Sequence, residues 1–310
     1  MLVRILGSGA GGGFPQWNCN CRNCNAVRSA QPGLRVRMQS SLAVSANGRD
    51  WALLNASPDL RQQIASAPAL YPAANGKVRN SPIKAAVLTN ADVDHVAGLI
   101  VLREAQPFSI YATHRVLNVI ESNSVFNVLG PHIVTRIPLE FGQPIRLTGA
   151  GVDLGLVVEA FDVPGKVALY LEDASAGPGL GTEVGDTIGL RVADPQTGKA
   201  FFYIPGCADV AASLRERLKG AALVFFDGTL FDDEEMIRAG LRDKRGSRMG
   251  HISISGPQGS VAAFRSLGVG WKIFVHINNS NPVLDESSPE RKAVEEAGWE
   301  IGYDGMEVRL

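Results

Sequence analysis

Three of the four cysteines lie close together, in the spacing Cys19-x-Cys21-x-x-Cys24. Three thiolates on one short loop can provide three corners of a tetrahedral zinc site. A disulfide framework fits poorly, because a large chain in a reducing compartment does not depend on disulfides. The spacing therefore predicts a structural zinc loop at residues 19–24, whose fourth ligand is not evident. The remaining cysteine, Cys207, is isolated, and we assign it no role.

A second set of metal-binding side chains follows an aliphatic run that ends at Leu88. Asp92, Asp94 and His95 lie within four positions of one another, and Asn90 comes just before them. Clustered carboxylates repel one another unless a cation or solvent lies between them. The spacing alone fits a solvated acidic loop and a metal site of oxygen and nitrogen ligands equally well.

His276 favours the metal site. It follows the apolar run Lys272–Val275, and it is one of three histidines, with His95 and His251, that lie where strands or glycine-flanked loops end. Two of these histidines and one aspartate would form a two-histidine, one-carboxylate set, which is typical of non-haem iron sites with open positions. The same atoms can hold zinc, so the residue types leave the metal open.

Two further residues are separate candidates for a role in catalysis. Asp227 ends a strongly apolar run, and His251 is of the residue type that acts as an acid or a base near neutral pH. Taken singly, a helix cap would explain the aspartate and a packed imidazole would explain the histidine equally well. The other histidines, His114 and His132, have no such context, and we interpret them as structural.

The glycine-rich run Gly7–Gly13 contains the pattern G-x-G-x-x-G after a predicted strand. A dinucleotide site needs a helix at this point and an acidic residue about 20 positions further on. Here the cysteine loop follows instead, and the first acidic residue is Asp50. We therefore reject a Rossmann nucleotide site and expect a tight crossing of backbones.

The elements that must position these residues are predicted to be short strands and helices. One hairpin is predicted at Ser40–Asn55 and a second joins Thr187–Val192 to Ala200–Ile204. Further strands are predicted at Ile83–Leu88, Phe108–Ala112, Val157–Phe161, Val167–Leu171, Leu223–Phe226, Lys272–His276 and Met306–Leu310. Helices are predicted at Pro58–Ala67, Arg115–Ser122, Val210–Leu218, Gly259–Leu267 and Pro289–Ala297. The pattern indicates an α+β fold with antiparallel-rich sheets covered by helices, and loops at Asp173–Glu183 and Arg238–Arg248 that could lie over a site.

The composition excludes several classes of function. The chain has 310 residues, 45% of them apolar and 20% charged, which rules out global disorder. Its net charge of -1 lacks the basic excess of a nucleic-acid-binding protein. No run approaches the ~20 apolar residues that cross a bilayer, and the N-terminus reads as a strand rather than a signal peptide. We therefore expect a cytoplasmic protein without a membrane span or a nucleic-acid partner.

Together these motifs resemble the metallo-β-lactamase superfamily. Its H-x-H-x-D-H box aligns with Asn90-x-Asp92-x-Asp94-His95, of which the last two positions match. More closely, the chain resembles the coenzyme PQQ synthesis protein B family. The stretches that carry this resemblance run from end to end of the chain: Leu6–Cys24, Asn55–Arg61, Asp94–Leu99, Phe226–Leu230, Met249–Ile252 and His276–Leu284.

The resemblance implies a four-layer αββα sandwich, formed as a single metallo-β-lactamase-like domain over residues 1–310, with the site at strand ends between two sheets. It also implies a structural zinc on the three clustered cysteines, in a region that this family links with dimer contacts, so we expect a homodimer. In related phosphodiesterase-like proteins the fourth zinc ligand is a histidine three residues beyond the equivalent of His276. Here that position is Asn279, which leaves the fourth ligand open.

The chain also departs from the superfamily. The third-motif histidine falls near Gly165 or Lys166, and the metal-bridging aspartate falls near Gly206 or Cys207. A two-zinc hydrolase needs both ligand sets to form its hydroxide nucleophile.

With about half of the ligands missing, we expect one well-formed metal on Asp94, His95 and His276, and Asp92 as an exchangeable ligand. Such a set with open positions suits Fe2+, and Zn2+ or Mn2+ are the alternatives.

Three functions follow from the resemblance. The first is an iron-dependent oxygenase of pyrroloquinoline quinone (PQQ) biosynthesis, which hydroxylates the tyrosine ring in the Glu–Tyr cross-linked product of a precursor peptide. In that function His251 and Asp227 would assist catalysis, with His251 moving protons, and Arg245 and Arg248 would pair with substrate carboxylates. The second is a non-catalytic carrier that helps PQQ or its precursor towards the periplasm, and the third is a residual zinc hydrolase.

Overall fold

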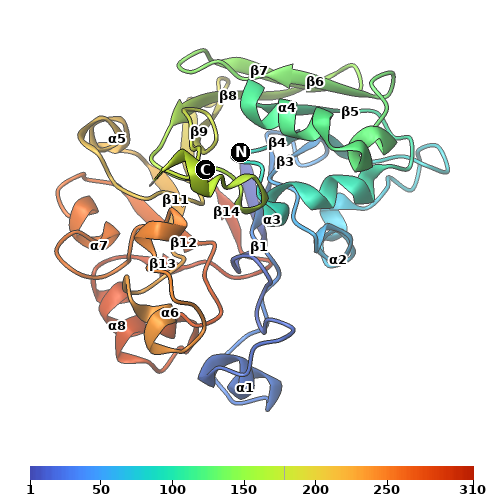
Figure 1. Cartoon of the computed structure of the whole chain (residues 1–310). Helices are drawn as coiled ribbons and strands as arrows, with labels where there is room; N and C mark the ends of the chain where they lie inside the picture. The colour runs from blue at the N-terminus through green and yellow to red at the C-terminus, as the bar shows by residue number, and fades with distance from the viewer. Residues whose placement is uncertain (178) are drawn as a thin grey trace.

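Two β-sheets face each other at the centre of the molecule, and helices cover the outer face of each (Figure 1). The structure is a computed structural model that describes residues 1–177 and 179–310. Within these residues each sheet has seven strands. The first sheet has the order β14-β1-β2-β3-β4-β5-β6, formed by β1 (Leu2–Gly7), β2 (Ser41–Ser45), β3 (Trp51–Leu54), β4 (Ile83–Val87), β5 (Phe108–Ala112), β6 (Val134–Pro138) and β14 (Glu307–Arg309). The second has the order β13-β12-β11-β10-β9-β8-β7, formed by β7 (Ile145–Gly149), β8 (Val152–Asp162), β9 (Ile188–Asp194), β10 (Lys199–Ile204), β11 (Leu223–Asp227), β12 (Trp271–Val275) and β13 (Glu300–Ile301).

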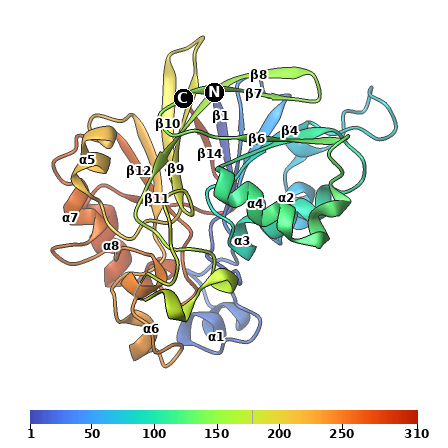
Figure 2. The same ribbon diagram turned by 45° about the horizontal axis from the view of Figure 1, so that its top comes forward.

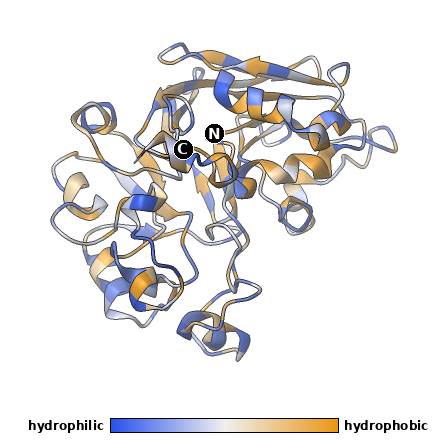
Figure 3. Cartoon of the chain, viewed as in Figure 1, coloured by the Kyte–Doolittle hydropathy of each residue, from blue (hydrophilic) through white to orange (hydrophobic). Residues whose placement is uncertain are grey.

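The hydrophobic core lies in three layers that separate the sheets and the helices. One cluster of buried residues fills the space between the sheets, with side chains such as Val44 from the first and Phe225 from the second. A second cluster lies under α2 and α4, and a third lies under α5, α7 and α8. The helices are α1 (Arg22–Arg28), α2 (Leu60–Ala65), α3 (Val93–Val96), α4 (His114–Ser122), α5 (Ala212–Leu218), α6 (Glu235–Arg238), α7 (Ser260–Phe264) and α8 (Pro289–Glu296). Figure 3 shows that the helices carry both polar and apolar residues, as expected of elements with one buried face. The predicted α+β fold with four αββα layers is confirmed.

Each sheet is half antiparallel and half parallel, so the prediction of antiparallel-rich sheets was wrong. Strands β14-β1-β2-β3 and β7-β8-β9-β10 pair antiparallel, whereas β3-β4-β5-β6 and β10-β11-β12-β13 pair parallel. Parallel neighbours need crossover connections, and the helices α2, α4, α5, α7 and α8 lie in them. The carboxyl ends of parallel strands share one edge of a sheet, so side chains that follow β11 and β12 can meet, and the packing of the two sheets brings the segment after β4 to the same place.

Most of the predicted elements are present. The two hairpins form as β2–β3 and β9–β10, and both pairs are antiparallel. The strand predicted at Val167–Leu171 does not form. Leu169–Leu171 is instead a short 3-10 helix, in which the Leu171 N–H donates to the Ala168 carbonyl at 2.8 Å, and the Leu169 N–H donates to the distant Asp92 Oδ1 at 3.0 Å instead of to a neighbouring strand.

The loop predicted at Asp173–Glu183 includes residue 178, which lies outside the described residues. Among the helices that the structure describes, none is long and apolar enough to cross a membrane.

The core between the sheets should carry much of the stability. Val44→Ala removes methyl groups from a fully buried side chain, so we expect a loss of about 2 kcal/mol in the free energy of unfolding, measured by urea denaturation. Val78→Ala is the matched control, because Val78 is 102% exposed and should change stability by less than about 0.5 kcal/mol. Equal effects of the two substitutions would contradict this placement of the core.

Candidate metal centre

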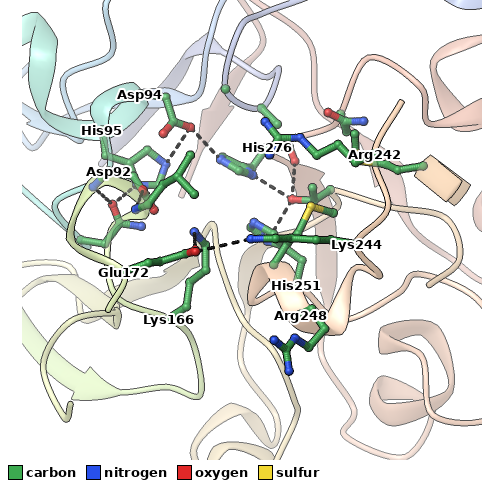
Figure 4. A pocket seen from close by; sticks show the side chains of 18 residues that line it. Asp92, Asp94, His95, Lys166, Glu172, Arg242, Lys244, Arg248, His251 and His276 are labelled. Carbon is green, nitrogen blue, oxygen red and sulfur yellow. Dashed lines mark hydrogen bonds and ion pairs between the residues drawn. The ribbon is translucent and has the colours of Figure 1, made fainter. Parts of the chain in front are cut away.

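A pocket between the sheets collects the side chains that the sequence singled out (Figure 4). Asp94 and His95 are on α3, which follows β4, and His276 directly follows β12. Asp227 is the last residue of β11, and His251 approaches from the connection between α6 and α7. Segments far apart in the chain therefore converge here, because β4, β11 and β12 present their carboxyl ends to the same place.

Asp94, His95 and His276 form a group, called the metal group below, whose ligand atoms all lie within 4.8 Å of one another. Asp94 Oδ2 is 3.1 Å from Nε2 of His276 and 3.8 Å from Nε2 of His95. The Nε2 atom of His95 is buried and, in the part of the chain that the structure describes, has no hydrogen-bond partner. A buried polar atom without a partner is costly, and a cation among these three groups would satisfy it. The residues therefore fit a metal ion.

The electrostatics of the three groups are coupled. Burial acts to raise the pKa of Asp94, but the two histidines outweigh it and hold that pKa well below its usual range. Burial lowers the pKa of His95 below its ordinary value, against the attraction of Asp94. Burial also acts to lower the pKa of His276, but the hydrogen bond and the charge of Asp94 outweigh it, and the pKa is raised. An ionised aspartate beside a neutral His95 is the state in which these groups bind a cation.

Each imidazole of the group is held by a partner at its other nitrogen. Nδ1 of His95 lies 2.7 Å from Oδ1 of Asn90, and Nδ1 of His276 lies 2.8 Å from Oγ1 of Thr229. With both Nδ1 atoms engaged as donors, both Nε2 lone pairs would be available to a cation, which would take the place of the hydrogen bond between His276 Nε2 and Asp94. His276 also has a φ of +57°, which a non-glycine residue rarely adopts and which is common at functional sites.

Asp227 is fully buried and connects the rest of the site. Its Oδ2 accepts from the backbone N–H of Cys207 at 2.9 Å and lies 2.7 Å from Nδ1 of His251. Its Oδ1 accepts from the backbone N–H and the hydroxyl of Thr229, at 3.0 and 2.6 Å. Burial acts to raise the pKa of Asp227, but His251 and His276 outweigh it, and the pKa is lowered.

The predicted pair of Asp227 and His251 is thus brought together, beside the metal group. The two residues and His276 form a second group of potential ligands within 4.8 Å, and the rings of His251 and His276 stack with centroids 5.3 Å apart. Since both oxygens of Asp227 already accept backbone hydrogen bonds, its clearest task is to orient His251, whose Nε2 is left for the pocket. Sequence reasoning missed Thr229, although it follows Asp227 by only two positions in the stretch Phe226–Leu230.

Asp92 lines the pocket but is not one of the three grouped ligands. Its Oδ1 accepts from the Leu169 N–H, and the hydroxyl of Tyr170 donates to the Ala91 carbonyl at 2.8 Å. These bonds attach the connection between β8 and β9 to the turn before α3. A role for Asp92 as an exchangeable metal ligand stays a prediction.

The predicted zinc loop is also assembled. The sulfur atoms of Cys19, Cys21 and Cys24 lie within 4.8 Å of one another, and the side-chain nitrogen of Asn279 lies 3.2, 3.6 and 3.3 Å from them. The two ends of an amide are assigned from its surroundings, so a half-turn of this group would present its oxygen to the same point. Three thiols and one amide on a common centre fit a tetrahedral ion, with Asn279 as the fourth side chain. Cys207 lies elsewhere, with its thiol donating to the Asp209 carbonyl at 3.0 Å.

Basic side chains surround the mouth of the metal pocket. Arg248 lines it, as the sequence predicted, whereas Arg245 is instead paired with Glu234 at 2.6 Å and is not among the lining residues. Three other cations line the pocket: Lys166, Arg242 and Lys244. Arg242 and Lys244 belong to the loop Arg238–Arg248 that was expected to lie over a site, although neither was singled out, whereas Lys166 comes from the connection between β8 and β9, where no local pattern indicates a binding role.

Comparisons with known proteins define first the class and then the family. Residues 50–277 match the family model described as a β-lactamase superfamily domain. The chain is 49% identical to coenzyme PQQ synthesis protein B of Bradyrhizobium diazoefficiens and 46% identical to that of Xanthomonas oryzae pv. oryzae, and each comparison covers 100% of both chains. Among solved structures, zinc-bound PqqB from Methylobacterium extorquens is 47% identical with a TM-score of 0.92, and all of both chains is covered. A diphosphatase of the PhnP family shares the fold, with a TM-score of 0.67 at 19% identity over 99% of this chain and 96% of its own.

The fold and the site therefore define a protein of the metallo-β-lactamase superfamily. Within that superfamily, the chain belongs to the coenzyme PQQ synthesis protein B family.

Loss of one thiol should empty the zinc loop without affecting the other site. We expect Cys24→Ser to lose about one zinc per chain and to unfold at lower temperature, because three ligands cannot hold a closed structural site as four do. Metal content by mass spectrometry and a thermal unfolding curve measure both effects. Cys207→Ser is the matched control and should keep the full zinc content, since Cys207 is outside the cluster. Zinc retained in Cys24→Ser would contradict the assignment.

A buried carboxyl of α6 lies between the two sites. Glu235 accepts hydrogen bonds from the Ser280 hydroxyl at 2.5 Å and the Phe231 N–H at 2.7 Å. Burial raises its pKa from 4.5 to about 7, although both hydrogen bonds act in the opposite direction. Glu235 therefore ties α6 to the segment that carries His276 and Asn279.

The Glu235 carboxyl should make stability depend on pH. Between pH values of about 4.5 and 7 the folded state keeps a proton that the unfolded state has released, so the free energy of unfolding falls as pH rises through this window. The contribution is on the order of a few kcal/mol. Glu235→Gln should remove this part of the decline, measured by urea unfolding at several pH values. Glu296→Gln, at an exposed residue, should keep the wild-type pH dependence, and an unchanged decline in Glu235→Gln would disprove the effect.

Proposed function

We propose that this protein is a metal-dependent oxygenase of PQQ biosynthesis, which adds oxygen to the tyrosine-derived ring of a Glu–Tyr cross-linked precursor. Family membership links the chain to the synthesis of coenzyme PQQ. The observation that carries the reaction type is the group Asp94, His95 and His276, in which a buried Nε2 of His95 has no partner among the described residues and one side is open to the pocket.

The donor set is the reason to prefer oxygen chemistry. Two histidines and one carboxylate with open positions are typical of non-haem iron, and the chemistry that Fe2+ would supply there is activation of dioxygen beside the substrate. The same ligands accept Zn2+ or Mn2+. A two-metal hydrolase is less consistent, because the Cys207 thiol is turned to the Asp209 carbonyl and both oxygens of Asp227 already accept backbone hydrogen bonds.

The surrounding side chains have separate tasks. Asn90 and Thr229 fix the two imidazoles of the metal group, so the ligand geometry is formed before substrate arrives. His251 can accept a proton from a ring hydroxyl at Nε2, while Asp227, bonded to its Nδ1, stabilises the charge that results. Arg248 can pair with a carboxylate of the substrate at the mouth of the pocket.

A homodimer and a cytoplasmic location stay predictions of the same proposal. A carrier of PQQ or its precursor would use the same pocket but has no need of an open metal site. Dependence of the activity on a metal at this site therefore distinguishes the oxygenase from the carrier.

Oxygen insertion should depend on iron and on His276. The metal-free active site would be loaded with Fe2+ under nitrogen and then given oxygen, a two-electron reductant such as ascorbate, and a short peptide that contains tyrosine or dihydroxyphenylalanine. The reductant is needed because insertion of one atom of O2 leaves the other to be reduced to water. We expect mass spectrometry to show a gain of one oxygen atom with Fe2+ and none with Zn2+. His276→Ala should reduce turnover by at least about a hundredfold, because it removes a metal ligand.

His132→Ala is the control, because His132 is an exposed histidine outside the pocket and should leave turnover unchanged. Zinc content of the cysteine loop would show that His276→Ala still folds. Product formed with Zn2+ in the absence of oxygen would favour the hydrolase. Binding of PQQ without turnover under any metal would favour the carrier.

A further inference from the structure

We infer that Lys166 and Lys244 form a binding site for one carboxylate of the ligand, and that Glu172 of the same chain occupies this site when the ligand is absent. The inference rests on the proposed function only for the identity of the ligand. The recognition chemistry comes from the pocket itself.

The two lysines converge on a single carboxyl group. Nζ of Lys166 lies 3.2 Å from Oε1 of Glu172, and Nζ of Lys244 lies 3.4 Å from Oε2 (Figure 4). All three residues line the pocket that contains His251 and His276. Lys166 comes from the connection between β8 and β9 and Lys244 from the segment after α6, so the carboxyl group bridges two sides of the mouth.

Lys166 is held in place by packing. Its stem lies over Gly250, where an added Cβ would be only 3.0 Å from Cγ of the lysine, and Gly250 has a φ of +82°. The hydroxyl of Thr187 donates to the Lys166 carbonyl at 3.0 Å, which fixes the backbone. The lysine side chain is 20% exposed. A preorganised ammonium group that lines the same pocket as His251 is a feature of a binding site and not of a solvated surface.

Charge in the pocket mouth is unbalanced in favour of an anion. Glu172 is 15% exposed, and although burial acts to raise its pKa, the two lysines outweigh it and hold that pKa below its ordinary value. Arg242 and Arg248 line the same mouth, and within the described ranges neither forms an ion pair. The pocket lining thus carries four cations against the carboxylates of Glu172, Asp92 and Asp94, of which Asp94 belongs to the group that would hold the metal.

This excess favours a ligand with several carboxylates, one of which can replace Glu172 between the lysines. The exchange keeps both charge-assisted hydrogen bonds and frees Glu172. The free-energy cost of ligand binding is then that of breaking the ion pairs between Glu172 and the two lysines, and not that of desolvating two unpaired lysines.

Glu172 is therefore a competitor of the ligand and not a support for it. If Glu172 competes with the ligand, Glu172→Gln should raise ligand affinity, and if it supports ligand binding, the same substitution should lower it. This difference makes the inference testable. The probe is PQQ, a tricarboxylate, and its uncharged trimethyl ester is the matched ligand control. Binding would be titrated by fluorescence on the metal-loaded full-length protein, without any requirement for turnover.

We expect Lys166→Gln and Lys244→Gln each to weaken PQQ binding about tenfold, the effect of one charge-assisted hydrogen bond. Neither should change binding of the trimethyl ester. Glu172→Gln should tighten PQQ binding several-fold, and this gain should shrink when Lys244→Gln is added, because the two side chains act on the same ligand group. Lys199→Gln removes an equal charge from an exposed lysine outside the pocket and should have no effect.

Weaker PQQ binding in Glu172→Gln, wild-type binding in both lysine variants, or no binding of PQQ to the wild-type protein would each overturn the inference. Metal content and circular dichroism would show that the variants are folded. The outcomes also separate this inference from the proposed function. PQQ binding that depends on the lysines, without oxygen insertion, would support the carboxylate site and contradict the oxygenase. Iron-dependent turnover that is unaffected by substitution of either lysine would support the oxygenase and contradict the carboxylate site.

Discussion

The site depends on a single buried carboxylate, that of Asp227. A charge without exposed surface is costly unless it is fully hydrogen-bonded, and this one receives two backbone N–H groups, one hydroxyl and one imidazole. Those bonds fix Thr229 and His251, and Thr229 in turn fixes His276. The orientation of two of the three pocket histidines therefore follows from one aspartate at the end of β11. Its removal would leave both rings free to turn.

The segment after β12 extends this constraint across the molecule. Within five residues, His276 reaches the metal group, Asn279 faces the three sulfurs and Ser280 donates to Glu235 of α6. Figures 1 and 2 show α1 and α6 at the same end of the molecule, where this segment lies between them. The cysteine loop and His276 are thus joined by a short backbone segment, although the cysteines lie outside the pocket.

The pocket combines an anionic floor with a cationic mouth. Asp94 and Asp227 lie at the metal group, whereas Lys166 and Lys244 lie at the entrance with Glu172 between them. A bound cation would neutralise the floor, and the mouth would then attract a polyacidic molecule and hold its ring above the metal group. The same fold serves hydrolases that hold two metals, so the side chains of the pocket and not the fold decide the reaction.

The sequence alone determined the local parts of this protein. The cysteine spacing, the pair Asp94-His95, the position of His276 at a strand end and both hairpins are short-range patterns. The hairpins are confirmed, and the cysteines and the pocket residues each come together, while their roles as metal ligands stay predictions. The mixed pairing of the sheets was missed although every parallel pair joins strands that are consecutive in the chain, because crossover helices such as α2 and α7 are too short to give a strong helical period. The tertiary structure also decided which groups meet: Asp94 and His276 are 182 positions apart, and Thr229, Lys166 and Lys244 have no motif of their own. Residue types and spacing encode the chemistry of each ligand, but ring orientation and charge balance are set by long-range contacts, which exist only once both sheets have packed together.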